Sequence, residues 1–228
     1  MPHYPCASCC GEECYHLEEN NFTGSEPNSD WVEQAGNWTI SSNILQTSDA
    51  DAIILATHEF ADDNVFLFVN LSDITLGEFV GTALRIIWGY EDDDNYWCIE
   101  CLWGAIVSSD RLRLIERVAG VETAHESVSG LFIRGLASTD TTLAVCIRNG
   151  YITFSTTGFD TGSFPLCMGP HTFPDSGRAG FGTGVNADPP LTIYEAVVAS
   201  NLGGTSWNPF DGFTEIVAID DCTYCEEC

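Results

Sequence analysis

Short runs of apolar residues, separated by turn-forming residues, recur along most of this chain. Alternation of apolar and polar side chains with a period of two is typical of strands that bury one face. The runs occupy residues 37–48, 51–58, 63–71, 81–90, 96–109, 111–120, 141–158, 191–200 and 212–220. This pattern predicts a protein built almost entirely from β-strands.

Two hairpins are indicated by their turn residues. Asn149-Gly150 separates two alternating runs, and both residues tolerate the positive φ that a type I′ turn requires. Ser42-Asn43 is expected to join two shorter strands within residues 37–48. These signals predict antiparallel pairing between strands that are adjacent in sequence.

The charged segment 108–128 is a candidate for an amphipathic helix, but its β-branched residues and Gly120 favour strands. We expect residues 111–120 to pair with residues 96–109 through a turn at Ser109-Asp110. The stretch 157–190 is rich in Gly, Pro, Ser and Thr and is interpreted mainly as loops. Within it, the glycines of residues 177–184 predict a tight, twisted strand that approaches another backbone closely.

Many short strands without a repeating period predict one all-β domain, a two-sheet antiparallel jelly-roll sandwich. We assign residues 17–220 to the sandwich and residues 1–16 and 221–228 to cysteine-rich tails. No stretch approaches the roughly 18 to 20 apolar residues of a membrane span, so membrane insertion is not expected.

The chain is strongly acidic, with 34 acidic residues against 7 arginines, no lysine and a net charge of -27. Binding to phosphate backbones depends on Lys and Arg, so the composition excludes nucleic acid as an expected partner. The acidity fits either solubility in salty or extracellular surroundings or the binding of cations. No signal-peptide pattern is visible at the start of the sequence. The expected location is extracellular or on the surface of a particle such as a virion.

Seven of the eleven cysteines lie in the two tails: Cys6, Cys9, Cys10, Cys14, Cys222, Cys225 and Cys228. Their Cys-x-x-Cys spacing suits a tetrahedral Zn²⁺ site. Disulfides within or between the tails are an alternative, and one that joined the two ends would add about 4 kcal/mol or more in the chain-entropy model. Cross-links between subunits are a third possibility, since the number of cysteines is odd.

The cysteines in the middle of the chain carry separate predictions. Cys98 and Cys101 are expected on opposite faces of one strand, because side chains alternate along a strand. One of them is a candidate disulfide partner for Cys146. The alternative is that they are buried thiols that act as small apolar residues.

Candidate binding residues lie on two loops. Asp92, Asp93, Asp94 and Asn95 form an acidic turn that is either simply solvated or a partial Ca²⁺ shell. Catalysis by paired carboxylates is least supported, because no third acid follows in register. Trp31, Trp38, Trp88, Trp97 and Trp103 are expected mainly in the core, whereas Trp207 on a glycine-rich loop is a candidate glycan contact. Asn21, Asn37 and Asn70 head glycosylation triplets.

Four segments taken together resemble laminin-G-like, concanavalin A-like jelly-roll domains over roughly residues 17–220. They are "NNFTGSEPNSDWVEQAGNWTISSNILQ", "IIWGYEDDDNYW", "AVCIRNGYITF" and "GRAGFGTGVN" with the later "LTIYEAVVAS". The resemblance implies that the first and last strands are neighbours. Residues 15–22 would then pair with a late strand such as 212–220, and the two tails would emerge on one side.

Three functions remain open from the sequence. The first is a non-catalytic structural or interaction subunit of an extracellular or particle-surface assembly, filament-like or virion-like, that associates with itself or with other surface proteins. The alternative is a carbohydrate-binding module with glycans as partners and Ca²⁺ at the acidic turn. A glycoside hydrolase, which the fold also accommodates, is the third.

Overall fold

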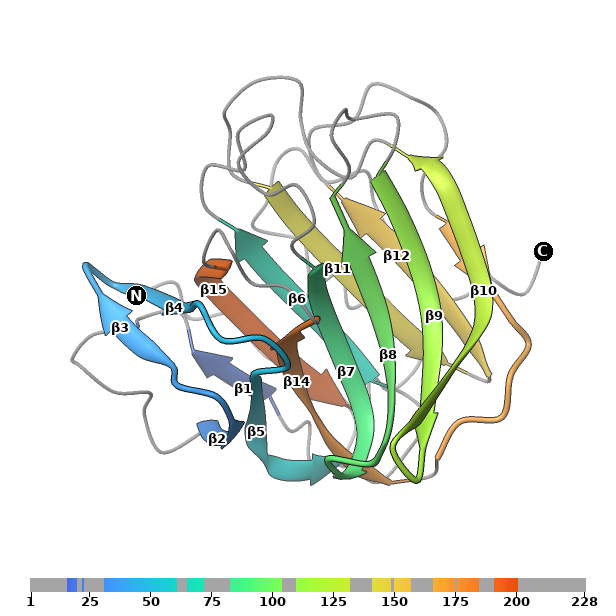
Figure 1. The fold of residues 1–228 in the computed structure, drawn as a ribbon, viewed down its shortest axis with the longest axis horizontal. Helices are drawn as coiled ribbons and strands as arrows, with labels where there is room; N and C mark the ends of the chain where they lie inside the picture. Colours follow the sequence, from blue (N-terminus) through green and yellow to red (C-terminus); the bar gives the residue numbers. More distant parts are fainter. Residues whose placement is uncertain are drawn as a thin grey trace, which may run out of the picture.

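A computed structural model describes residues 16–19, 22, 31–60, 65–71, 83–103, 110–131, 141–148, 150–156, 166–174, 176–184 and 191–200. All regular elements in these ranges are β-strands, as Figure 1 shows, and every pairing is antiparallel. The all-β prediction is therefore confirmed. In the described part of the chain, no helix has the length and apolar character needed to cross a membrane.

The strands have the following bounds: β1 His16–Glu19, β2 Trp31–Ala35, β3 Thr39–Ser41, β4 Ile44–Thr47, β5 Ile53–Phe60, β6 Val65–Leu71, β7 Ala83–Asp92, β8 Asn95–Leu102, β9 Asp110–Val118, β10 Val121–Leu131, β11 Thr141–Arg148, β12 Tyr151–Thr156, β13 Leu166–Met168, β14 Gly177–Thr183 and β15 Leu191–Ser200.

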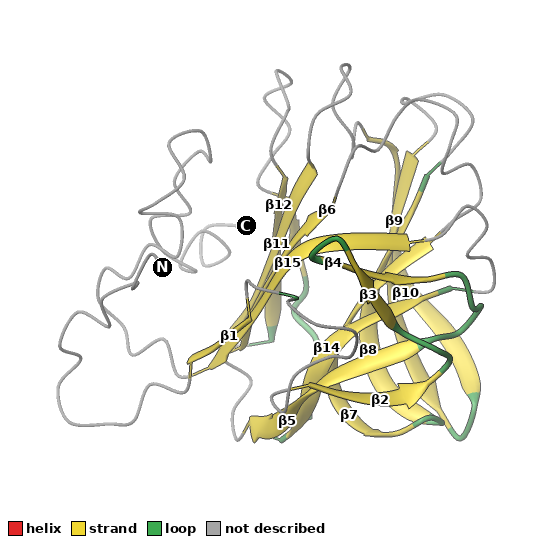
Figure 2. Ribbon diagram, turned by 90° about the vertical axis from the view of Figure 1, so that its left-hand side faces the viewer, coloured by secondary structure: helices red, strands yellow, loops and turns green. Residues whose placement is uncertain are grey.

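The strands form two sheets that pack face to face (Figure 2). The eight-stranded sheet has the order β13-β12-β11-β6-β15-β4-β3, with β1 paired to β15, and the seven-stranded sheet has the order β10-β9-β8-β7-β14-β5-β2. Side chains from both sheets share one hydrophobic core. The five tryptophans expected in the core are all buried: Trp31, Trp38, Trp88, Trp97 and Trp103.

Both hairpins marked by turn residues are confirmed. Ser42 and Asn43 have φ of 54° and 64° between β3 and β4. Gly150 has φ of 80° between β11 and β12, and the register pairs Arg148 with Tyr151. Positive φ at these positions is what a two-residue hairpin needs to match the twist of its strands.

The charged segment 108–128 forms a strand hairpin, β9–β10, as its composition favoured. Its turn lies at Ala119 and Gly120, which have φ of 49° and 78°. Strands β8 and β9 pair antiparallel as expected. Of the predicted turn Ser109-Asp110, Ser109 lies outside the described residues, whereas Asp110 already belongs to β9. Strand β8 ends at Leu102, and β9 starts at Asp110. Asp110 is fully buried, whereas a turn residue is expected to be exposed.

The glycine-rich strand β14 lies between β5 and β7 and approaches the backbone of β5 closely, as predicted. A Cβ atom on Gly180 would lie 2.2 Å from the backbone oxygen of Ile54, and one on Gly182 would lie 2.7 Å from that of Ala52. No side chain fits at Gly180 without movement of the backbone. The glycines therefore allow β14 to join the two halves of the seven-stranded sheet.

The first and last described strands are neighbours, as the family resemblance implied. Strand β1 pairs with β15, with His16 opposite Ala199, and β15 pairs with β6 on its other side. The suggested partner, residues 212–220, lies outside the described residues, and so do both cysteine tails. The pairing of β1 brings the start of the described chain to the eight-stranded sheet.

Candidate functional site

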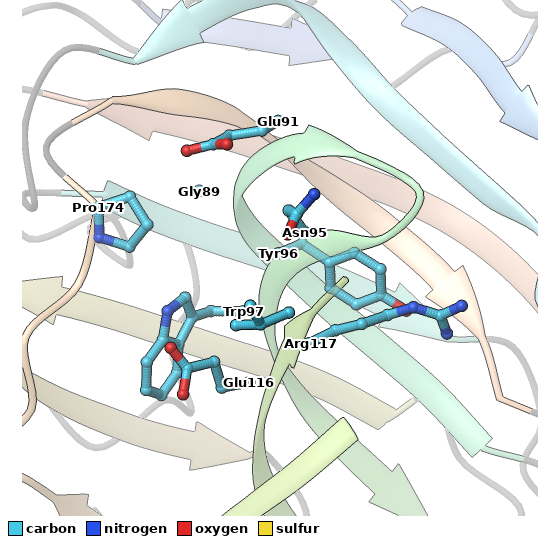
Figure 3. Close-up of a pocket in the computed structure, with 9 residues that line it drawn as sticks. Gly89, Glu91, Asn95, Tyr96, Trp97, Glu116, Arg117 and Pro174 are labelled. Carbon is cyan, nitrogen blue, oxygen red and sulfur yellow. The ribbon is translucent and has the colours of Figure 1, made fainter. Parts of the chain in front are cut away.

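A pocket of about 170 Å³ lies at the end of the sandwich where the β7–β8 and β9–β10 hairpins turn (Figure 3). Its lining combines aromatic, amide and carboxylate groups from three strands and one later segment. The lining residues are Gly89, Glu91, Asn95, Tyr96, Trp97, Glu116, Arg117, Val118 and Pro174. We take this pocket, called here the hairpin-end pocket, as the candidate functional site.

The two hairpin turns beside the pocket are hydrogen-bonded to each other. The Ala119 N–H donates to Asn95 Oδ1 at 3.0 Å, and the Gly120 N–H donates to the backbone oxygen of Asp94 at 3.0 Å. Asn95 Nδ2 in turn donates to Asp92 Oδ1 at 2.7 Å. These bonds fix the Asn95 amide at the pocket and couple the positions of the two turns.

Trp97 supplies the aromatic wall of the pocket. Its side chain is 6% exposed, stacks on His125 with 4.9 Å between ring centroids, and meets Phe173 edge-on at 5.0 Å. Directly opposite on β9 lies Glu116, whose Oε2 is 2.8 Å from His125 Nε2. Figure 3 shows the Trp97 ring and the Glu116 carboxylate side by side. A rigid ring and an oriented carboxylate thus line the same pocket.

Glu126 of β10 fastens residues 169–174 to the sheet, and this segment brings Pro174 to the pocket lining. Glu126 Oε1 accepts the Gly169 N–H at 2.9 Å and lies 2.7 Å from His171 Nε2. At the end of the segment, Pro174 packs so closely on Gly89 that a Cβ there would lie 2.8 Å from Pro174 Cγ. Glu126 therefore positions the segment that closes the pocket.

Glu126→Ala is expected to lower the free energy of unfolding by about 1 to 3 kcal/mol, because it removes the acceptor of two hydrogen bonds. Amide hydrogen exchange should rise most in residues 169–174. Thr123→Ala is the matched control, since Thr123 is exposed on the same strand. Unchanged exchange in residues 169–174 of the Glu126→Ala variant would show that Glu126 does not hold this segment.

The acidic turn uses its oxygens in local hydrogen bonds. Asp92 Oδ1 accepts the Asp94 N–H at 2.9 Å, and the Tyr90 hydroxyl donates to Asp93 Oδ1 at 2.5 Å. Burial and this hydrogen bond to Asp93 raise the pKa of Tyr90. Within the described residues, no group of three or more His, Cys, Asp or Glu side chains is arranged to hold a metal ion. Calcium at Asp92–Asn95 stays a prediction.

The structure describes only some of the other candidate residues. Trp207, Asn21 and the seven tail cysteines lie outside the described residues, as does the side chain of Asn70. Asn37 is exposed, and its Nδ2 donates to Asp49 Oδ2 at 2.7 Å. Asn37 and Thr39 of this glycosylation triplet therefore lie at the surface, whereas Trp38 between them is buried.

The predicted disulfide between Cys146 and Cys98 or Cys101 is wrong. Cys98 and Cys101 are free thiols on β8, whereas Cys146 lies on β11 in the other sheet and is disulfide-bonded elsewhere. Cys98 and Cys101 do point to opposite faces, since they belong to different apolar clusters. Burial raises the pKa of Cys98 to about 12, so it acts as a small apolar residue, as the alternative proposed.

Sequence reasoning missed an ion-pair network on the outer face of the seven-stranded sheet. Arg85 donates to Glu100 Oε2 through Nε at 3.1 Å and Nη2 at 3.0 Å, and Arg113 donates to Glu100 Oε1. Both Arg85 and Glu100 have side chains only 3% exposed. The alternation of arginines with apolar residues on β9 indicated a charged outer face. It could not show which residues pair with these arginines, because their partners lie on other strands.

The fold is a concanavalin A-like β-sandwich, as comparison with solved structures shows. No family model and no curated protein sequence matches the chain. The exoplasmic/lumenal domain of VIP36 in its Ca²⁺/Man-bound form is 13% identical, with a TM-score of 0.57 over 90% of this chain and 96% of that chain. A lectin from Bauhinia forficata in complex with GalNAc is 14% identical, with a TM-score of 0.56 over 83% of this chain and 99% of that one.

The same sandwich is found within a larger protein. The GH43 protein BlXynB from Bacillus licheniformis is 11% identical, with a TM-score of 0.56 over 80% of this chain. This chain spans 39% of that protein. Sequence identities this low establish the shared fold alone.

Proposed function

We propose that this chain is a carbohydrate-binding module that takes a sugar ring in the hairpin-end pocket. The observation that carries the proposal is the lining itself, in which the Trp97 ring lies beside the carboxylate of Glu116, and Glu91 lines another part of the same pocket. An aromatic ring packs on the apolar face of a sugar, and carboxylate and amide groups bond its hydroxyls. A pocket of about 170 Å³ is smaller than the roughly 300 to 1,000 Å³ of drug-sized sites, which limits it to one ring.

The solved structures support a glycan partner over a purely structural subunit. VIP36 is seen with mannose and the Bauhinia forficata lectin with GalNAc, on the same fold. The proposal extends to an extracellular setting, which agrees with the exoplasmic/lumenal origin of the VIP36 domain. The laminin-G-like subdivision, and self-association through the cysteine tails, stand as further parts of the proposal.

A glycan array followed by titration of the best ligand tests the proposed function. Tryptophan fluorescence reports binding because Trp97 lines the pocket. Glu91→Ala is expected to weaken binding about tenfold, since it removes one hydrogen-bond acceptor from the ligand. Glu91 is exposed and its carboxylate has no hydrogen bond within the described residues, so the fold should not change.

Glu33→Ala is the matched control, because Glu33 is an exposed glutamate on β2, at the far edge of the same sheet. Equal affinity of the Glu91→Ala variant and the unmodified chain would contradict the proposal, as would an array without any bound glycan. The same titration in EDTA decides whether calcium at the acidic turn takes part.

A further inference from the structure

Arginine is scarce in this chain, and several arginines share one surface. The sequence has 7 basic residues against 34 acidic ones. On β9, Arg111, Arg113 and Arg117 alternate with Leu112 and Leu114, which are fully buried in the core. Because side chains alternate along a strand, the three arginines lie on the outer face of the seven-stranded sheet.

Arg111 differs from the other two arginines because it lacks an anionic partner. Arg113 donates to Glu100, and Arg117 Nη1 donates to Glu122 at 3.3 Å. The Arg111 side chain forms no hydrogen bond or ion pair with any described residue, and its Nε is buried without a partner. An unsatisfied, partly buried guanidinium costs free energy. In a chain so rich in carboxylates, the Arg111 side chain thus keeps donors that are free to bind an anion from outside.

Two hydroxyl groups lie beside these arginines. Ser127 is opposite Arg113 and Ser129 is opposite Arg111 on the neighbouring strand β10, and both serines are exposed. Val128 between them packs on the core, so the serines share the outer face with the arginines. Directly opposite residues have Cβ atoms about 4.5 to 5.5 Å apart, so one small ligand reaches all four side chains.

Arg113 also retains unused donors. Its Nε and Nη2 donate to Glu100 Oε1, whereas its Nη1 has no partner among the described residues, and its side chain is 33% exposed. Arg111 and Arg113 therefore present guanidinium N–H groups from adjacent positions on one face. A guanidinium matches a carboxylate in planar, two-bond geometry.

We propose that Arg111 and Arg113, with Ser127 and Ser129, bind the carboxylate of an acidic sugar at a site separate from the hairpin-end pocket. The hydroxyls of the two serines would bond the ring hydroxyls next to that carboxylate. A macromolecule with a broad anionic surface is repelled by a chain of net charge -27. A short oligouronate carries only a few charges in total and presents each carboxylate beside ring hydroxyls, and is the ligand class that we propose.

The test titrates the trisaccharide of galacturonic acid and its full methyl ester, which has the same sugar rings but carries neutral methyl esters in place of the carboxylates. The unmodified chain should bind the acid more than tenfold more tightly than the ester. Arg111→Gln should lower affinity for the acid at least tenfold, while Arg111→Lys, which keeps a point charge, should lose less. The Arg111 side chain has no hydrogen bond or ion pair to lose within the described residues, so both variants should fold, which circular dichroism checks.

Glu91→Ala separates this site from the pocket and should leave affinity for the acid unchanged. Equal affinity for acid and ester, no binding of the acid, or full retention of binding in the Arg111→Gln variant would each overturn the proposal. So would loss of acid binding in Glu91→Ala alone. Titration of neutral sugars tests the hairpin-end pocket independently, because their binding should weaken in the Glu91→Ala variant and not in the Arg111→Gln variant.

Discussion

Replacing Glu100 with alanine is expected to lower the free energy of unfolding by about 3 to 4 kcal/mol, near the lower end of the range for a broken buried ion pair. Glu100 accepts hydrogen bonds from both Arg85 and Arg113. Without the Glu100 carboxylate, the Arg85 side chain, which is only 3% exposed, loses its main partner. Glu122, 3.0 Å from Arg85 Nη1, compensates in part.

Arg85 cannot avoid this cost by losing its proton. Burial alone would lower the pKa of Arg85, but its interactions with Cys98, Tyr96, Glu100 and Glu122 raise the pKa instead, and a guanidinium keeps its proton in proteins. Urea denaturation of the Glu100→Ala variant measures the loss of stability, with Glu59→Ala on β5 as the exposed control. A loss no larger than that of the control would show that the network does not stabilise the sheet.

Gly180→Ala is expected to lower the free energy of unfolding by about 3 kcal/mol, at the upper end of ordinary overpacking costs. The added methyl group would lie 2.2 Å from the backbone oxygen of Ile54 and 2.7 Å from the Cα atom of Leu55. Both atoms belong to the backbone, so a rotamer change cannot relieve the contact. Relief requires that β14 and β5 separate, which breaks hydrogen bonds between them.

Gly182→Ala provides a graded comparison on the same strand. Its methyl group would lie 2.7 Å from Ala52 O and 3.1 Å from the movable Ile87 Cδ1, a less severe overlap. We therefore expect a smaller loss than for Gly180→Ala, measured by urea denaturation of both variants. Equal stability of the Gly180→Ala variant and the unmodified chain would contradict the close approach of β14 to β5.

Local signals predicted the fold well where the physical cause is local. Asn149-Gly150 and Ser42-Asn43 predicted their hairpins because a two-residue turn itself demands positive φ. The glycines of β14 predicted a close backbone approach because only glycine lacks the Cβ that would collide. The turn at Ala119-Gly120 was missed, since alanine is not a usual residue at positive φ. Bonds from the neighbouring hairpin turn to the Ala119 and Gly120 N–H groups hold it there.

The pocket could not be predicted from the sequence, because its parts meet only in three dimensions. Glu126 and His171 are 45 residues apart in sequence, yet their side chains lie 2.7 Å apart and hold the segment that ends with Pro174 in the pocket lining. Trp97 was correctly predicted as a core residue, but nothing in its neighbours showed that one edge of it would line a pocket. The acidic turn was recognised as a binding candidate, and Asn95 at its end does line the pocket.

A crystal structure of the chain with the sugar selected on the glycan array tests the central claim most directly. Binding in the hairpin-end pocket predicts a sugar ring in contact with Trp97, with its hydroxyls bonded to Glu91 or Glu116. A sugar bound elsewhere, for example at Trp207, with the pocket left empty, would contradict it.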